Sequence, residues 1–126
     1  MGWLRAGVGA GLVVLPGRFL RLSGREAPTA VSILLMRTIG IRDLVLGLGT
    51  VSAARGGDHG DVRRWTSAGL ASDSLDVVAS LAASRAIGPV ESAGAAAAAL
   101  LFAVGDTLVL GSLGASVPDP DGQAVR

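Results

Sequence analysis

The hydrophobic residues of this chain fall into four long segments separated by short charged turns. The segments cover residues 3–22, 28–54, 62–87 and 89–115. A helix rises about 1.5 Å per residue, and about 20 apolar residues cross a bilayer, so each of the last three segments is long enough to span it. The pattern predicts an all-α protein, an integral membrane antiparallel four-helix bundle within residues 1–117.

The first segment is the most ambiguous of the four. Its uninterrupted apolar run, Ala6 to Leu15, stops at Pro16, so a helix that reaches the far side of a bilayer must continue through Pro16 with a kink. Arg5 before this run also imitates a signal peptide. Because Pro-Gly-Arg follows Leu15 and provides no small-x-small cleavage site, we interpret the segment as a retained membrane helix.

Capping residues mark the other segment ends. Pro28 and Thr29 open the second segment and a Gly-Gly pair follows it, as expected for a helix start and stop. Asp61 is expected to cap the third helix, and Gly88-Pro89 predicts a tight turn into the fourth. Residues 118–126 are polar and contain proline, which predicts a disordered tail.

Composition narrows the functional classes. Half of the residues are hydrophobic and only 3% are aromatic, while 19 are glycine, a mixture that lets membrane helices approach closely. The absence of cysteine excludes disulfides, thiolate catalysis and cysteine-based metal sites. The basic residues are all arginines, scattered without the basic stripe that nucleic acid requires, so we expect no nucleic-acid partner.

Ionisable side chains interrupt the apolar segments and are the main functional lead. They are Arg37, Arg42, Asp43, Asp73, Asp76 and Asp106. A charge at the membrane centre costs about 2.5–3.5 kcal/mol on insertion scales, so such groups normally face a bundle interior, a partner or a water-filled cavity. Two arginines do not balance four aspartates, and Arg5 is one possible source of further positive charge.

Helical spacing assigns these side chains to faces. The third segment carries one polar stripe at spacings of three and four, which we expect to point into the bundle: Thr66, Gly69, Asp73, Asp76, Ser80 and Ser84. In the second segment Arg42 and Asp43 lie on different faces, and Arg37 lies on a third, from which it can reach an interface. The guanidinium of Arg42 is suited to a two-pronged pair with a carboxylate.

The candidate buried polar network or ligand site therefore comprises five residues, with two secondary candidates. The five are Arg42, Asp43, Asp73, Asp76 and Asp106, and the secondary candidates are Arg37 and Ser80. Three interpretations remain open: a structural network that fixes helix packing, a ligand or proton site, or an interface with another membrane subunit. The loop residue His59, even with its neighbouring carboxylates, does not define a metal site, and no metal or cofactor is expected.

One stretch resembles a known family. The sequence Gly40-x-Arg42-Asp43-x-x-x-Gly47, followed by Trp65 and Asp73-x-x-Asp76, resembles small actinobacterial-type four-helix membrane proteins of domain-of-unknown-function family 4267 and, more broadly, DoxX-like bundles. The likeness covers roughly residues 3 to 115. It implies an integral membrane four-helix protein and carries over no catalytic residue.

The expected function is that of a nonenzymatic protein of the cell membrane. It would bind an apolar or amphipathic small molecule or serve as an accessory subunit of a membrane complex. The expected partners are the lipid bilayer and either a second copy of the chain or another membrane subunit. The alternative is an oligomeric small-molecule or proton-coupled transporter. An enzyme is not favoured, because no nucleophile, metal set or cofactor motif accompanies the aspartates. The distribution of loop arginines, five against four, favours multi-pass insertion with both termini in the cytoplasm.

Overall fold

The computed structural model describes residues 1–22 and 27–115, which form helices and contain no strand. The all-α prediction is therefore confirmed. The predicted tail, residues 118–126, lies outside the described residues. The helices are α1 (Gly2–Val14), α2 (Pro16–Leu22), α3 (Ala30–Gly56), α4 (His59–Ala82), α5 (Ser84–Ile87) and α6 (Pro89–Ala115).

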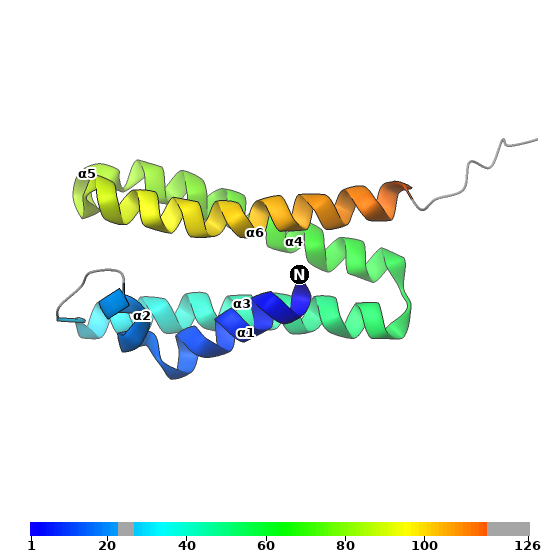
Figure 1. Cartoon of the computed structure of the whole chain (residues 1–126), viewed down its shortest axis with the longest axis horizontal. Helices are drawn as coiled ribbons and strands as arrows, with labels where there is room; N and C mark the ends of the chain where they lie inside the picture. Colours follow the sequence, from blue (N-terminus) through cyan, green and yellow to red (C-terminus); the bar gives the residue numbers. More distant parts are fainter. Residues whose placement is uncertain (23–26, 116–126) are drawn as a thin grey trace, which may run out of the picture.

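The longer helices form two antiparallel pairs. α1 packs along α3, and α4 packs along α6, while α3 and α4 join the two pairs (Figure 1). The pairing of α1 with α3 is antiparallel because Gly2 lies beside Val51 and Gly9 lies beside Gly40. Each pair is thus formed by segments that are consecutive among the long helices of the chain.

The first segment contains a break where the sequence predicted a kinked but continuous helix. α1 ends at Val14, Leu15 has φ −124° and ψ 44°, and α2 begins at Pro16. The ring of a proline disfavours the helical conformation in the residue before it, whereas its own fixed φ suits the first position of a new helix. The expectation of one continuous helix through Pro16 was therefore wrong.

Capping explains the starts and stops of α3 and α4. Thr29 caps α3 by accepting a hydrogen bond from the backbone N–H of Ser32, and α3 stops at Gly57, which has a φ of 73° that favours glycine. The cap of α4 is Asp58, whose side chain accepts a bond of 3.0 Å from the N–H of Asp61. The expected cap, Asp61, instead lies in the first turn of α4.

The connection between α4 and α6 is less simple than the predicted tight turn. α4 ends at Ala82, and the four-residue helix α5 intervenes before Gly88. Gly88 has a φ of 95°, a left-handed value that a side chain would oppose, and Pro89 then starts α6. The Gly88-Pro89 pair is therefore the last step of the turn rather than the whole of it.

Glycines allow the backbones of α1 and α3 to touch. A Cβ atom on Gly40 would lie 2.7 Å from the carbonyl oxygen of Gly9, and a Cβ on Gly9 would lie 2.6 Å from the carbonyl oxygen of Gly40. Gly47 contacts Ala6 in the same way farther along the pair. Small residues at such contacts bring helices close enough for dispersion contacts between backbones.

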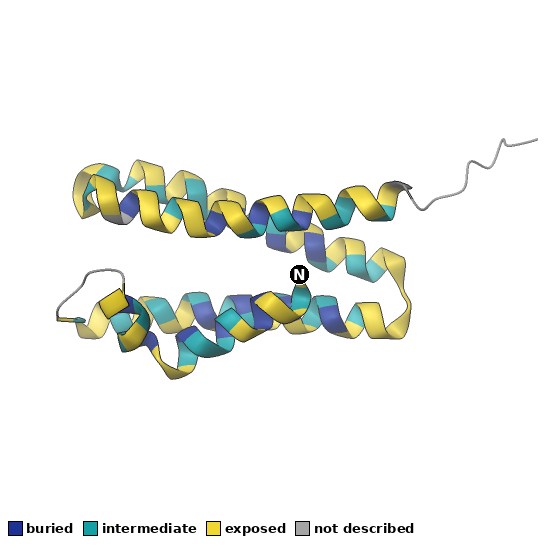
Figure 2. Ribbon diagram, in the orientation of Figure 1, coloured by how far each residue is buried: buried dark blue, intermediate teal, exposed yellow. Residues whose placement is uncertain are grey.

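Many large apolar residues are exposed while several charged residues are buried. The exposed fractions are 64% for Leu34, 70% for Leu75 and 75% for Leu101, whereas Leu12 and Leu20 are buried. Buried residues gather where helices face one another, and the buried apolar set is small (Figure 2). Among the described residues, seven polar or charged ones are buried beside it: Arg5, Ser32, Asp43, Thr66, Asp73, Ser92 and Asp106. Charged groups are rarely buried without partners, and large apolar faces are rarely left uncovered.

Among the described residues, one helix is long and apolar enough to cross a membrane, and its span is Ser92–Gly114. α1 is apolar but has only 13 residues, which is about 20 Å against a hydrocarbon core of about 30 Å. α3 and α4 are long enough to cross a membrane, but with their charged residues they are not apolar enough. The expectation that the second, third and fourth segments would each qualify as spans thus holds only for the fourth.

The glycine contact makes a direct prediction about stability. Gly40→Ala should lower the free energy of unfolding by about 1–3 kcal/mol, because the new methyl group would press on the backbone of α1. SDS titration of the purified protein followed by circular dichroism measures this change. Gly7→Ala is the matched control, since a Cβ on Gly7 meets no atom within 4 Å. Equal stability of the two variants would contradict the close contact.

Candidate functional site

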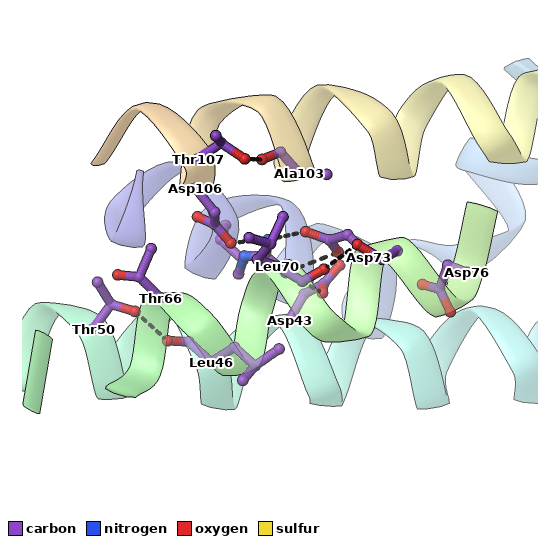
Figure 3. A network of polar contacts seen from close by, with 12 residues as sticks. Asp43, Leu46, Thr50, Thr66, Leu70, Asp73, Asp76, Ala103, Asp106 and Thr107 are labelled. Carbon is purple, nitrogen blue, oxygen red and sulfur yellow. Dashed lines mark hydrogen bonds and ion pairs between the residues drawn. The ribbon is translucent and has the colours of Figure 1, made fainter. Parts of the chain in front are cut away.

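The centre of the molecule is a buried guanidinium. Arg5, in the first turns of α1, is 2% exposed. Its two terminal nitrogens contact three aspartates that come from three other helices: Asp43 of α3, Asp73 of α4 and Asp106 of α6. Figure 3 shows these three carboxylates converging on one point between the helices. One side chain thereby connects all four of the longer helices.

The guanidinium of Arg5 makes a two-pronged pair with one aspartate and a single hydrogen bond with each of two others. Nη1 and Nη2 donate to the two carboxylate oxygens of Asp73, the Nη1 bond to Oδ1 measuring 3.1 Å. Nη1 also donates to Asp43 at 3.3 Å, and Nη2 donates to Asp106 at 2.9 Å. Two-pronged pairs of this kind fix orientation as well as distance. The Asp73 carboxylate is therefore the main partner, with Asp43 and Asp106 on either side.

A second arginine extends the network towards the surface. Arg42 donates from Nη2 to Oδ1 of Asp43 at 3.1 Å and from Nη1 to Asp76 at 2.6 Å. Oδ1 of Asp43 is therefore shared between Arg5 and Arg42. The side chains of Arg42 and Asp76 are 29% and 38% exposed, so this end of the network opens outward while the Arg5 end is closed.

Two neighbouring residues make room for the central pairs. Gly69 of α4 lies beside Asp106, and a Cβ atom at this position would collide with the carboxylate and lie 3.4 Å from the guanidinium carbon of Arg5. The ring of Phe102 in α6 lies 4.7 Å from the same carbon, which places the cation over an aromatic face. The absence of a side chain at Gly69 thus leaves space for the pair of Asp106 with Arg5, and the ring of Phe102 packs against the guanidinium.

The network has more acid than base. Arg5 and Arg42 face Asp43, Asp73, Asp76 and Asp106, so the fully ionised set carries two positive and four negative charges. Each of the four carboxylates contacts at least one guanidinium. Chemically, this arrangement is suited to holding helices together, since both arginines are occupied by internal partners.

The five main candidates from the sequence meet in this network, although one of them binds differently from expectation. Arg42 and Asp43 start from different faces of α3, but the long side chain of Arg42 bends round to its neighbour. Arg42 contacts two separate carboxylates, and the two-pronged pair predicted for it is made by Arg5 with Asp73.

The secondary candidates lie outside the network. Arg37 is exposed and Ser80 is half-buried, and in the part of the chain that the structure describes neither side chain makes a hydrogen bond or ion pair with the network residues. Within residues 1–22 and 27–115, no group of three or more histidine, aspartate or glutamate side chains is arranged to hold a metal ion.

Arg5 was expected as one source of positive charge for the interior, and it lies at the centre of the network. The same residue was also counted among the loop arginines, because a basic residue before an apolar run is typical of a membrane-surface anchor or a signal peptide. Two signals point the other way. The interior segments have a deficit of positive charge, and Arg5 lies one residue before Ala6 and four residues before Gly9, both of which pack against α3.

Comparisons of the chain with protein-family models, with curated proteins and with solved structures found no match. The geometry of the network and the distribution of apolar surface are therefore the basis for assigning a function.

The central role of Arg5 predicts a large loss on its removal. Arg5→Ala should lower the free energy of unfolding by about 3–5 kcal/mol, because it leaves buried carboxylates without a counter-charge. Adding Asp73→Asn and Asp106→Asn to Arg5→Ala should recover more than half of that loss, since Asp43 keeps Arg42 as a partner. SDS unfolding of the three proteins tests both statements. A triple variant less stable than Arg5→Ala would contradict charge imbalance as the cause.

Proposed function

We propose that the chain is an integral membrane four-helix bundle that binds an apolar or amphipathic small molecule within the bilayer and catalyses no reaction. The observation that carries this proposal is the apolar exterior around a charged interior. Large leucine faces such as those of Leu75 and Leu101 are uncovered, whereas Arg5 and Asp73 are almost completely buried. Lipid is the solvent in which such a distribution is favourable, because it covers apolar faces and rejects exposed charge.

The charges of α3 and α4 are compatible with membrane crossing in this proposal. Asp43 and Asp73 point inward to Arg5, and Arg42 pairs with Asp43 and Asp76, so these groups do not face lipid singly. Arg37 is exposed, but it lies seven residues after Ala30, the first residue of α3, and its long side chain can extend towards the membrane surface. α1 and α2 together form the first crossing, and both termini lie in the cytoplasm.

Binding fits the network better than catalysis does. The arginines and carboxylates engage one another and are held in place by packing, so their first role is to fix the arrangement of the helices. The outer faces and the grooves between helices are then the surfaces left for a ligand or for a larger membrane complex. The resemblance of the Gly40 to Gly47 motif to DoxX-like and domain-of-unknown-function 4267 proteins agrees with this proposal.

Cysteine accessibility tests the membrane placement, since the chain has no cysteine of its own. In inside-out native membrane vesicles, which expose the cytoplasmic side, Leu34→Cys, Leu75→Cys and Leu101→Cys should resist a water-soluble maleimide, because lipid covers α3, α4 and α6. His59→Cys, in the exposed turn at the start of α4, is the matched control and should react at least ten-fold faster. Gel-shift labelling with and without SDS measures the rates.

The labelling pattern separates three outcomes. Protection of all three leucine positions supports the four-helix membrane bundle. Protection of Leu101→Cys alone, with labelling of the α3 and α4 positions, contradicts it and leaves a single membrane span. Labelling of every position as fast as His59→Cys contradicts any membrane crossing.

Native mass spectrometry of the protein released from lipid nanodiscs tests the binding function. We expect a population of constant added mass that organic extraction removes and that persists in Arg37→Gln, a change outside the network. Reconstituted protein that retains no molecule but conducts protons in proteoliposomes, and loses that flux in Asp76→Asn, would overturn binding in favour of transport.

A further inference from the structure

A groove lies between the C-terminal half of α3 and the start of α4, away from the Arg5 network. Its volume is about 560 Å³, within the range of small-molecule sites. Val45 and Leu48 of α3 line one side, and Trp65 of α4 lines the other. The indole rests on Gly49, where a Cβ atom would collide with the ring, so the tryptophan is seated as a fixed wall.

The groove is apolar at one end and acidic at the other. It extends along α3 from Val45 to Gly56, which corresponds to about 16 Å of helix rise. Asp58 and Asp61 are its charged lining residues, and both lie at the Gly56 end. A molecule that fills the groove would therefore place an alkyl body along Val45 and its polar head at the two carboxylates.

The nearby arginines leave this acidic end available. Arg64 contacts Asp61 at 3.0 Å, but its side chain is 81% exposed, and exposed pairs of this kind contribute little and exchange readily. Arg55 is directed to the ring of Trp3, at 4.9 Å from its centre. Asp58 uses one oxygen, Oδ1, to cap α4. The lining charge of the groove is thus negative, which complements a cation.

We infer that this groove binds an amphipathic amine, with its alkyl chain between Val45, Leu48 and Trp65 and its ammonium group at Asp58 and Asp61. This inference rests on the proposed function, because it names the class of ligand and the place where it binds. In a bilayer the acidic end would lie near the membrane surface, where the head group of an amphipathic molecule is hydrated.

Trp65 provides the signal for a test. The chain has two tryptophans, so Trp3→Phe leaves Trp65 as the sole fluorophore. Titration of this protein in nanodiscs with dodecylamine should give a saturable change in Trp65 emission. Dodecanoate and dodecanol, with the same chain length, should require at least ten-fold higher concentrations for the same change.

Variants separate the head group from the groove. Asp58→Asn with Asp61→Asn should weaken dodecylamine binding at least ten-fold, and asparagine caps a helix as well as aspartate does, so α4 should be retained. Ala53→Phe should block binding by filling the groove, whereas Leu101→Ala, on the outer face of α6, should leave it unchanged.

Each outcome decides the inference. Saturable binding of dodecylamine that is lost in the asparagine double variant and in Ala53→Phe supports it. A response that never saturates, equal responses to the three probes, or no effect of the asparagine changes overturns it. If native mass spectrometry still finds a retained molecule in Ala53→Phe, the binding function stands and this groove is excluded as its site.

Discussion

The fold depends on one guanidinium in a place where most small domains have a cluster of large apolar side chains. Arg5 connects Asp43, Asp73 and Asp106, and through Asp43 it reaches Arg42 and the outer pair with Asp76. A buried ion pair is weak evidence of net stability, because desolvation offsets much of the attraction. The effect of the network on which arrangement of the helices is adopted is clearer. Any shift of a helix along its neighbour would separate a buried charge from its counter-charge, so the network selects one register for all four helices.

Close packing of the α1 backbone against α3 allows Arg5 of the short helix α1 to reach carboxylates on three other helices. The contacts of Gly9 with Gly40 and of Ala6 with Gly47 lie on either side of Asp43 along α3, and Arg5 adjoins the second of them. With larger residues at these positions α1 would stand farther from α3, and the guanidinium would no longer reach three carboxylates at once. The glycines and the ion pairs are therefore parts of one arrangement, although their contributions differ in kind: dispersion in the first, electrostatics in the second.

The sequence predicted features that depend on neighbouring residues, and it predicted less well those that depend on contacts between residues far apart in the chain. The helical class, the Thr29 start of α3 and the glycine stop after it follow from spacing and capping chemistry. The inward stripe predicted for the third segment is confirmed in its first half, since Thr66, Gly69 and Asp73 are buried. Asp76 and Ser80 are only half-buried, and Ser84 lies in α5. The break before Pro16, the cap at Asp58 and the helix α5 depend on local backbone competition that periodicity does not resolve. The sequence indicated Arg5 only as one source of positive charge, because its partners are 38 to 101 residues away in the chain and no local pattern identifies them.

The burial of the Arg5 end of the network also bears on where recognition can occur. Both arginines of the interior are engaged with carboxylates, and the closed end at Arg5 is too buried to admit a ligand without loss of an ion pair. If the chain binds a small molecule as we propose, selectivity for that molecule comes from groups that are exposed and lightly paired. Asp58 and Asp61 at the end of the α3 and α4 groove have this character, since one of them caps a helix through a single oxygen and the other pairs with an exposed arginine. The charged interior therefore fixes the helices, and in our proposal the apolar exterior supplies the surface that binds a ligand.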